Sequence, residues 1–150
     1  MMMRRWFVLI LAIGLPVTAA RVQAASVWEW HYRAPGIDAS GTLVTGDAPD
    51  AAGFYQVTSI QGQRNGVDII ALQPAGMPIP GNEPYAVDNL LRTDPPHLTK
   101  HGIGFALRDG SHTNPFYADF KTPPVYLEFY AKPGDTAERP VVFSAVRRSR

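Results

Sequence analysis

The sequence predicts an all-β protein: an antiparallel meander of about eight or nine strands that follows an N-terminal signal peptide. Three observations lead to this fold class. Apolar residues recur at every second position in short runs, turn-forming residues separate those runs, and 14 prolines leave no stretch with a helical stripe. A β-sandwich is favoured over a closed β-barrel, although strands of about five to seven residues suit both.

The first 24 residues have the three parts of a secretory signal peptide. Two arginines precede an apolar run over residues 6–15, and small residues follow up to Ala24. A retained membrane anchor is the alternative reading. However, Pro16 and Arg21 interrupt the run before it reaches the roughly 20 apolar residues that a span requires. We therefore expect cleavage after Ala24, with cleavage after Ala20 as the second choice, and a secreted or periplasmic protein.

Composition limits the classes of partner. Residues 25–146 are expected to form one domain, and residues 147–150 a basic tail with three arginines. Cleavage removes three of the 14 basic residues, so 11 remain against 13 acidic ones, and the mature chain carries a net charge of −2. An acidic body argues against nucleic acid, and three arginines are fewer than the about four to eight of a lipid-binding cluster. The absence of cysteine excludes disulfides and thiolate metal sites.

The first predicted strand is the clearest one. Trp28, Trp30 and Tyr32 alternate with charged or polar residues, so one face of this strand is aromatic and the other is charged. A turn at residues 34–36 follows, and residues 41–45 are expected to return beside the first strand. Residues 46–53, rich in Asp, Ala and Pro, are predicted to form a loop.

The next predicted strands cover residues 54–60 and 67–73, and Asn65-Gly66 supplies the positive φ angles of a tight hairpin turn between them. Residues 74–84 hold four prolines and cannot continue a hydrogen-bonded ladder, so they are predicted to form a long connection over the surface or across one end of the fold. Residues 88–91 are expected to form a short edge strand.

A second hairpin is predicted from residues 103–107 and 116–120, with a turn at residues 108–111. In the strand after it, Val125, Leu127 and Phe129 share one face, and Tyr126, Glu128 and Tyr130 share the other. Residues 141–146 are the last predicted strand, reached through a turn at residues 132–135.

Two clusters resemble reactive sites. His97 and His101 have the i, i+4 spacing that binds a metal on a helix, but a Pro-Pro pair precedes them and Gly102 follows. Asp109, Ser111 and His112 bring together the groups of a nucleophilic triad, yet Asp and Ser beside Asp-Gly also cap their own turn. We interpret both clusters as loop and turn residues.

Two kinds of carboxylate site were also considered. Glu29 and Glu128 would form an acid–base pair only if their strands met on a common face, and Glu29 fits a solvated sheet surface with cross-strand ion pairs. Residues 46–50 and 88–89 are candidate calcium loops, but neither has the dense acidic alternation of a loop built for that ion. The sequence thus predicts no catalytic residue, no metal site and no cofactor.

Trp28, Trp30 and Tyr32 are the candidate ligand-binding residues. If this aromatic row faces water, it would form a platform for carbohydrate or peptide. The alternative is that the row belongs to the hydrophobic core, which is the commoner place for aromatics at alternate strand positions.

The order of elements resembles a loose group of small secreted bacterial proteins, many of which end in a PEP-CTERM sorting signal. The matching pieces are residues 39–43, 57–66, 79–82, 88–91 and 102–107. The resemblance implies a secreted β-protein and no particular activity. Residues 146–150 contain neither Pro-Glu-Pro nor an apolar helix, so a soluble protein is expected rather than one anchored by that signal.

We therefore expect an exported envelope or extracellular β-domain with a non-catalytic binding or structural role, acting through surface loops on an unidentified partner. A carrier of a small apolar ligand inside a lipocalin-like barrel is the alternative. A hydrolase whose site cannot be paired from sequence is the second alternative.

Overall fold

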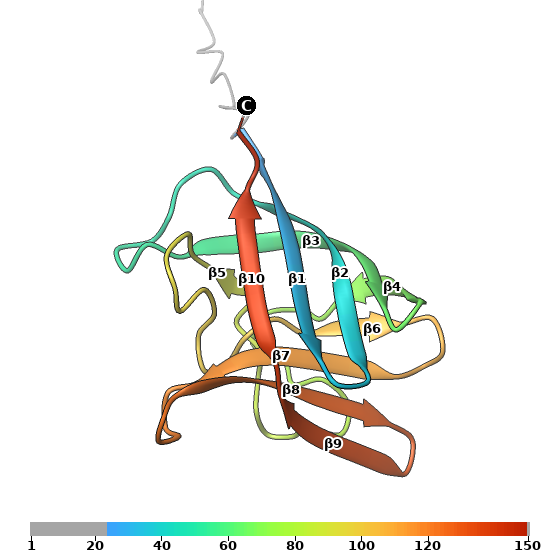
Figure 1. Cartoon of the computed structure of the whole chain (residues 1–150). Coiled ribbons are helices and arrows are strands. Elements are labelled where there is room, and N and C mark those ends of the chain that lie inside the picture. The colour runs from blue at the N-terminus through green and yellow to red at the C-terminus, as the bar shows by residue number, and fades with distance from the viewer. Residues whose placement is uncertain (1–23, 150) are drawn as a thin grey trace, which may run out of the picture.

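The computed structural model describes residues 24–149 and contains ten β-strands and, within those residues, no helix (Figure 1). The strands are β1 (Ser26–Ala34), β2 (Ile37–Thr45), β3 (Tyr55–Arg64), β4 (Val67–Leu72), β5 (Leu90–Leu91), β6 (Phe105–Leu107), β7 (His112–Ala118), β8 (Val125–Lys132), β9 (Asp135–Pro140) and β10 (Val142–Arg147). The all-β prediction is confirmed. The predicted signal peptide lies outside the described residues except for Ala24. In the described part of the chain, no helix is long and apolar enough to cross a membrane.

The strands form an antiparallel meander. One path runs through the sheet in the order β10-β1-β2-β3-β4-β6-β7-β8-β9, and β5 pairs with β3 beside this path. Apart from β5 and β10, neighbours in the sheet are also neighbours in the sequence, as the consecutive hairpins predict. The exception closes the fold, because β10 pairs with β1, so the last strand lies against the first (Figure 1).

Two corners bend this sheet into a nearly closed barrel. At the first corner, β4 pairs with β3 through Val67 and Asp68 and then continues beside β6. The second corner lies between β9, which pairs with β8, and β10, which pairs with β1. Val141, at the bend between them, donates its N–H to the carbonyl of Tyr126 at 3.0 Å. Figure 1 shows β10, β1 and β2 crossing over β6, β7 and β8. Layers packed face to face, as in the expected sandwich, are therefore combined with the closure of a single sheet, as in a barrel.

The predicted Asn-Gly hairpin turn is confirmed. Asn65 and Gly66 have φ angles of 48° and 79°, both positive, as a type I′ turn requires. The Asn65 side chain also accepts a hydrogen bond from the N–H of Asp38 (2.8 Å) and donates one to the carbonyl of Gly36 (2.9 Å). The β3–β4 turn is thereby attached to the β1–β2 turn at the same end of the barrel.

Two glycines allow β2 and β3 to approach each other closely. Gly41 and Gly62 are partners in the strand register. A Cβ atom at Gly41 would overlap the carbonyl oxygen of Gln61, and one at Gly62 would overlap that of Ser40. Since the clashing atoms belong to the backbone, a side chain at either position would push the strands apart.

The long connection from residue 73 to residue 104 packs into the domain rather than only lying over it. Ile79 and Val87 are fully buried, and their methyl groups occupy the space beside Gly104. Asn89 fixes the path of this connection. Its backbone has a positive φ of 53°. Its side chain donates a hydrogen bond to the carbonyl of Gln73 (2.6 Å) and accepts one from the N–H of Gly104 (3.0 Å).

Successive side chains of β7 and β8 point to opposite faces, as predicted, but both faces of this hairpin carry buried side chains. Tyr126, Glu128 and Tyr130 point into the barrel, while a second cluster of buried apolar side chains lies on the outer face. This outer cluster consists of Phe116, Ala118 and Leu127, with Val125 and Phe129 packed against it. The more apolar face of this hairpin is therefore the outer one.

The C-terminal region is more ordered than the sequence indicates. β9 is a strand where only a turn and a connection were expected. Arg147 belongs to β10 and pairs with Asp47 at 2.8 Å, and Arg148 pairs with Glu29 at 2.7 Å. Two of the three arginines assigned to a basic tail thus contact the folded domain.

Candidate functional site

The predicted aromatic row is part of the core and does not face water. Trp28, Trp30 and Tyr32 are each at most 3% exposed. The ring of Trp30 lies 5.8 Å from the rings of both Tyr32 and Phe105, and the ring of Tyr32 lies 6.4 Å from that of Phe143. The hypothesis of a surface platform at these residues is therefore wrong, because closing β10 and β6 over β1 buries its aromatic face.

The two histidines do not converge on a metal. His97 is buried, with its Nδ1 atom 3.0 Å from the carbonyl oxygen of Arg92, while His101 is exposed. Within residues 24–149, no group of three or more His, Cys, Asp or Glu side chains is placed to hold a metal ion.

The Asp109, Ser111 and His112 cluster is a turn, as interpreted. The Asp109 carboxylate accepts hydrogen bonds from both the N–H (3.0 Å) and the hydroxyl (2.5 Å) of Ser111. These bonds hold the pKa of Asp109 below its usual value. The serine hydroxyl is thus committed to the turn carboxylate rather than to a histidine.

The two glutamates lie on opposite sides of the sheet. Glu29 is on the outer surface with Arg148, whereas Glu128 is inside the barrel and 1% exposed. In the candidate calcium loop at residues 46–50, Asp47 pairs with Arg147 on β10, while Asp50 acts locally. Asp50 accepts from the N–H groups of Ala52 and Phe54, both at 2.9 Å.

Asp88, in the other candidate calcium loop, has a local role as well. Its carboxylate accepts from the Thr99 hydroxyl (2.6 Å) and from the N–H of Leu90 (3.2 Å). Partial burial raises its pKa.

The strongest electrostatic feature is an ion pair at one end of the barrel. The Arg64 guanidinium donates to both carboxylate oxygens of Glu128, at 2.7 Å through Nε and 2.6 Å through Nη2, and stacks 4.2 Å from the ring centre of Tyr130. The hydroxyl of Tyr32 also donates to Glu128 and lies 3.3 Å from the Thr113 hydroxyl. Burial, together with the negative charge of Glu128, raises the pKa of Tyr32 well above its usual value.

This cluster connects strands rather than offering a reactive group. A general base needs a lone pair within reach of substrate, but Glu128 directs one oxygen to Arg64 and the other to both Arg64 and Tyr32. The contacts join β3, β8 and β1 across the interior. The arrangement therefore holds these strands together at one end of the barrel, and its chemistry is that of a buried, hydrogen-bonded ion pair.

An open groove of about 650 Å³ lies on the outer side of β7, β8 and β9 and is here called the outer groove. From the long connection, it is lined by Asn82, Tyr85, Ala86, Lys100 and His101. The remaining lining residues, from the β7–β9 region, are Phe116, Phe120, Phe129, Asn114 and Glu138. The outer groove therefore lies beside the second apolar cluster.

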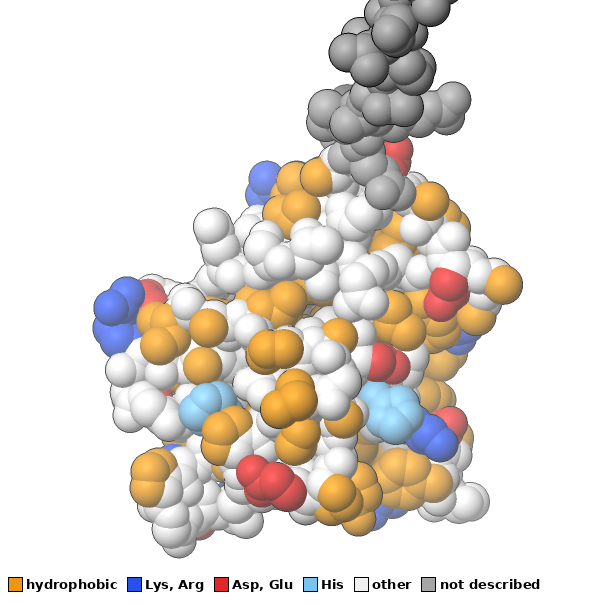
Figure 2. Space-filling model, turned by 180° about the vertical axis from the view of Figure 1, so that it is seen from behind, with side chains coloured by type: hydrophobic (Ala, Val, Ile, Leu, Met, Phe, Trp, Pro, Cys, Tyr) orange, Lys and Arg blue, Asp and Glu red, His pale blue; other side chains and the backbone are white. Residues whose placement is uncertain are grey.

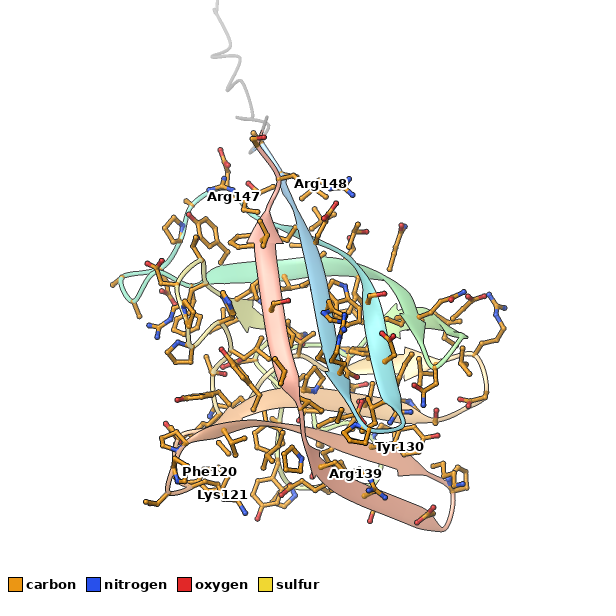
Figure 3. All side chains as sticks on the ribbon, viewed as in Figure 1. Phe120, Lys121, Tyr130, Arg139, Arg147 and Arg148 are labelled. Atoms are coloured by element: carbon orange, nitrogen blue, oxygen red, sulfur yellow. The ribbon has the colours of Figure 1, made fainter. Side chains whose placement is uncertain are left out.

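Two exposed aromatic rings flank the outer groove. Tyr85 is 69% exposed and Phe120 is 66% exposed, and they are the aromatics among the large hydrophobic side chains that the described residues expose. Figure 3 shows Phe120, with Lys121 beside it, at the turn between β7 and β8. Removing an aromatic ring from water into an apolar contact is favourable, so two exposed rings at one groove favour a contact surface.

The wall of the outer groove is held rigidly. Asn114, which is buried, donates to the carbonyl of His101 (3.0 Å) and to that of Ile103 (3.1 Å). These bonds attach the segment that carries Lys100 and His101 to β7. Asn82 makes only a long contact with Asn114, at 3.5 Å, so its amide has hydrogen-bonding capacity left for another molecule.

Sequence reasoning pointed to the surface loops but missed these residues. Tyr85 follows the proline-rich connection directly, and Phe120 was assigned to a strand face although the strand ends at Ala118. The available signal was a single large aromatic within a turn-forming segment, as in Glu83-Pro84-Tyr85 and Asp119-Phe120-Lys121. Such residues have no periodic partner, and their convergence depends on tertiary structure.

Comparisons with known proteins add no relative: no family model, no curated protein and no solved structure matches this chain.

Proposed function

We propose that this protein is an exported, non-catalytic binding domain that recognises its partner in the cell envelope or outside the cell through the outer groove. The single observation that carries the proposal is that Tyr85 and Phe120, the exposed aromatics of residues 24–149, both line this one groove. Connections on a rigid β-sheet are where binding residues are commonly placed.

Two further features support a binding role over the alternatives. The interior expected for a carrier is occupied by ring contacts of Trp30 with Tyr32 and Phe105. The buried carboxylate that a hydrolase would need, Glu128, already binds Arg64 and Tyr32. Export is supported by the sequence of residues 1–24.

The first experiment tests export. The full chain is expressed in a bacterial host, the cells are fractionated, and the N-terminus of the purified protein is sequenced. We expect protein outside the cytoplasm that begins at Ala25, or at Arg21 for the second-choice site. Full-length protein retained in the cytoplasm or in the inner membrane would contradict the proposal.

The second experiment tests binding. Purified protein is mixed with washed envelope material and sedimented, and the bound fraction is compared with that of the variant carrying both Tyr85→Ser and Phe120→Ser. Val142→Ser is the matched control, because Val142 is 72% exposed on β10, away from the groove. We expect binding by the wild type and by the control, and its loss in the double variant. Equal sedimentation of all three proteins would refute a role for the outer groove.

A further inference from the structure

The chemistry of the outer groove identifies a class of ligand, and this inference rests on the proposed function. We propose that the outer groove binds a neutral glycan chain, with Tyr85 and Phe120 as stacking surfaces for sugar rings and with Asn82 and Glu138 as partners for sugar hydroxyls.

The aromatic rings provide the first argument. The face of an aromatic ring is electron-rich, and its edge is electron-poor. A sugar ring presents C–H groups with partial positive charge on one face, which complements the aromatic face, and hydroxyl groups around its edge. Tyr85 and Phe120 are both about two-thirds exposed, so their ring faces are available for such contacts.

The polar lining provides the second argument. Hydroxyl groups both donate and accept hydrogen bonds, so a glycan site needs both kinds of partner. The Glu138 carboxylate accepts, the Lys100 ammonium donates, and the Asn82 amide does both. This set is found around the same groove as the two exposed rings.

The charge balance of the outer groove favours an uncharged ligand. Lys100 and Glu138 contribute opposite charges, and His101 adds a titratable imidazole. An acidic polymer such as nucleic acid is held by several basic side chains. Figure 2 shows Lys and Arg side chains scattered over the rear face rather than gathered in one basic patch.

The strand pairing beneath the outer groove argues against an extended peptide. Peptides that bind to β-sheets usually pair with an open strand edge through main-chain hydrogen bonds. β7 is paired on both sides, by β6 and β8, and β8 is paired by β7 and β9. Neither β7 nor β8 offers an edge. In the described residues β9 is paired only with β8, but its sequence, Asp135–Pro140, carries charged residues and a proline, which disfavour the addition of a strand. We therefore expect recognition through the exposed aromatic and polar side chains.

The rear wall of the outer groove has a supporting role. Phe116 is nearly buried and Phe129 is half-buried in the second apolar cluster, which fixes the sheet under the ligand. Because Tyr85 and Phe120 contribute little to that cluster, they can be replaced without loss of the fold. This separation allows binding and stability to be measured independently.

The test uses defined oligosaccharides. The purified protein is titrated calorimetrically with neutral hexamers of β-1,4-linked glucose, β-1,4-linked N-acetylglucosamine and α-1,4-linked glucose. An acidic galacturonate oligomer and an apolar peptide are titrated in parallel. We expect at least one neutral hexamer to bind, with weaker binding of the acidic oligomer and of the peptide.

The variants assign the contacts. Tyr85→Ala and Phe120→Ala are each expected to weaken binding roughly tenfold, as for aromatic contact residues at interfaces generally. Glu138→Gln is expected to weaken it a few-fold, because the amide keeps one acceptor oxygen. Val142→Ala, on β10, should leave the affinity unchanged. Circular dichroism and thermal unfolding of each variant verify that the fold is retained.

Each result bears on one level of the argument. If no neutral hexamer binds at up to about 10 mM, or if the peptide binds more tightly, the glycan assignment is overturned. Loss of envelope sedimentation in the double serine variant would still support the proposed function in that case. If a neutral hexamer binds but Tyr85→Ala and Phe120→Ala do not weaken it, the ligand binds elsewhere and the assignment to the outer groove is overturned.

Discussion

Replacement of Arg64 by methionine should destabilise the domain by removing the partner of a buried charge. Glu128 is 1% exposed, and Arg64 supplies two of its hydrogen bonds, at 2.6 and 2.7 Å. In Arg64→Met only the hydroxyl of Tyr32 still donates to the carboxylate. Breaking a buried ion pair in this way costs about 3–5 kcal/mol, out of a total unfolding free energy of about 5–15 kcal/mol.

Urea unfolding followed by tryptophan fluorescence measures this effect, since Trp28 and Trp30 are buried in the core. A loss of about 4 kcal/mol with a slope of about 1.5 kcal/mol/M lowers the midpoint by roughly 2.5 M. Arg108→Met is the control. Its ion pair with Asp68 is exposed, so we expect a change of about 0–1 kcal/mol.

The double variant Arg64→Met/Glu128→Met separates the two contributions. Once both charges are absent, no charged group is left buried and unpaired, and apolar replacements of buried ion pairs are often neutral. We therefore expect the double variant to be more stable than Arg64→Met. If the two single-variant losses simply add in the double variant, Arg64 and Glu128 are not coupled and the reasoning fails.

Three further predictions concern other parts of the fold. Gly41→Ala should reduce the unfolding free energy, measured by thermal unfolding, by more than about 2 kcal/mol, because the added methyl group would overlap backbone atoms. Gly46→Ala is the control: its methyl group meets open space, so the unfolding free energy should change by less than about 0.5 kcal/mol. Asn89→Ala should cost about 2–4 kcal/mol in urea unfolding, because two buried backbone groups lose their partner, and a change below about 1 kcal/mol would refute this role. Tyr32 should stay protonated when exposed tyrosines ionise above about pH 10. Because its folded pKa is raised, it contributes stability below the unfolded pKa that is lost as the pH rises further. Burial also raises the pKa of Tyr126. Ultraviolet absorbance during a pH titration should then show at least one fewer phenolate for folded wild type than for the unfolded chain, and no difference between wild type and Tyr32→Phe in the folded state.

The local features of the fold could be predicted from the sequence because they depend on neighbouring residues. The alternation of Trp28, Trp30 and Tyr32 predicts the strand and separates its aromatic face from its charged face, and Asn65-Gly66 predicts the turn with positive φ at both positions. β5 also lies within the short edge strand predicted at residues 88–91. Each of these signals is contained within a few residues.

The features that required the structure depend on contacts between distant residues. Alternation separated the two faces of β8 correctly but could not show that Glu128 lies inside, because its partner Arg64 is 64 positions away. β9 was missed because its sequence, Asp135–Pro140, has little apolar alternation, and it is held by pairing with β8 rather than by burial.

The candidate site was the least predictable part. Tyr85 and Phe120 lie in separate connections. Tyr85 belongs to no periodic pattern, and the alternation of Phe116, Ala118 and Phe120 placed Phe120 on a strand that ends at Ala118. The aromatic row that the sequence emphasised is in the core, since an alternating aromatic strand is most easily satisfied by burial. Isolated exposed aromatics are the better signal of binding, but they can be recognised only when the fold brings them together.

The pairing of β10 with β1 has a consequence for the order in which the domain forms. Trp28 and Arg147 are register partners that are separated by nearly the whole of the domain, so the first strand receives its second neighbour only when the most distant segment arrives. Closing so long a loop is entropically slow, and two-state proteins rich in such pairings fold in about milliseconds to seconds. The β1–β2 hairpin can form early, but the aromatic face of β1 stays exposed to solvent until residues 142–147 pair with it. A chain interrupted before those residues would expose two tryptophans and a tyrosine, so the core of the domain can be completed only after the last strand is available.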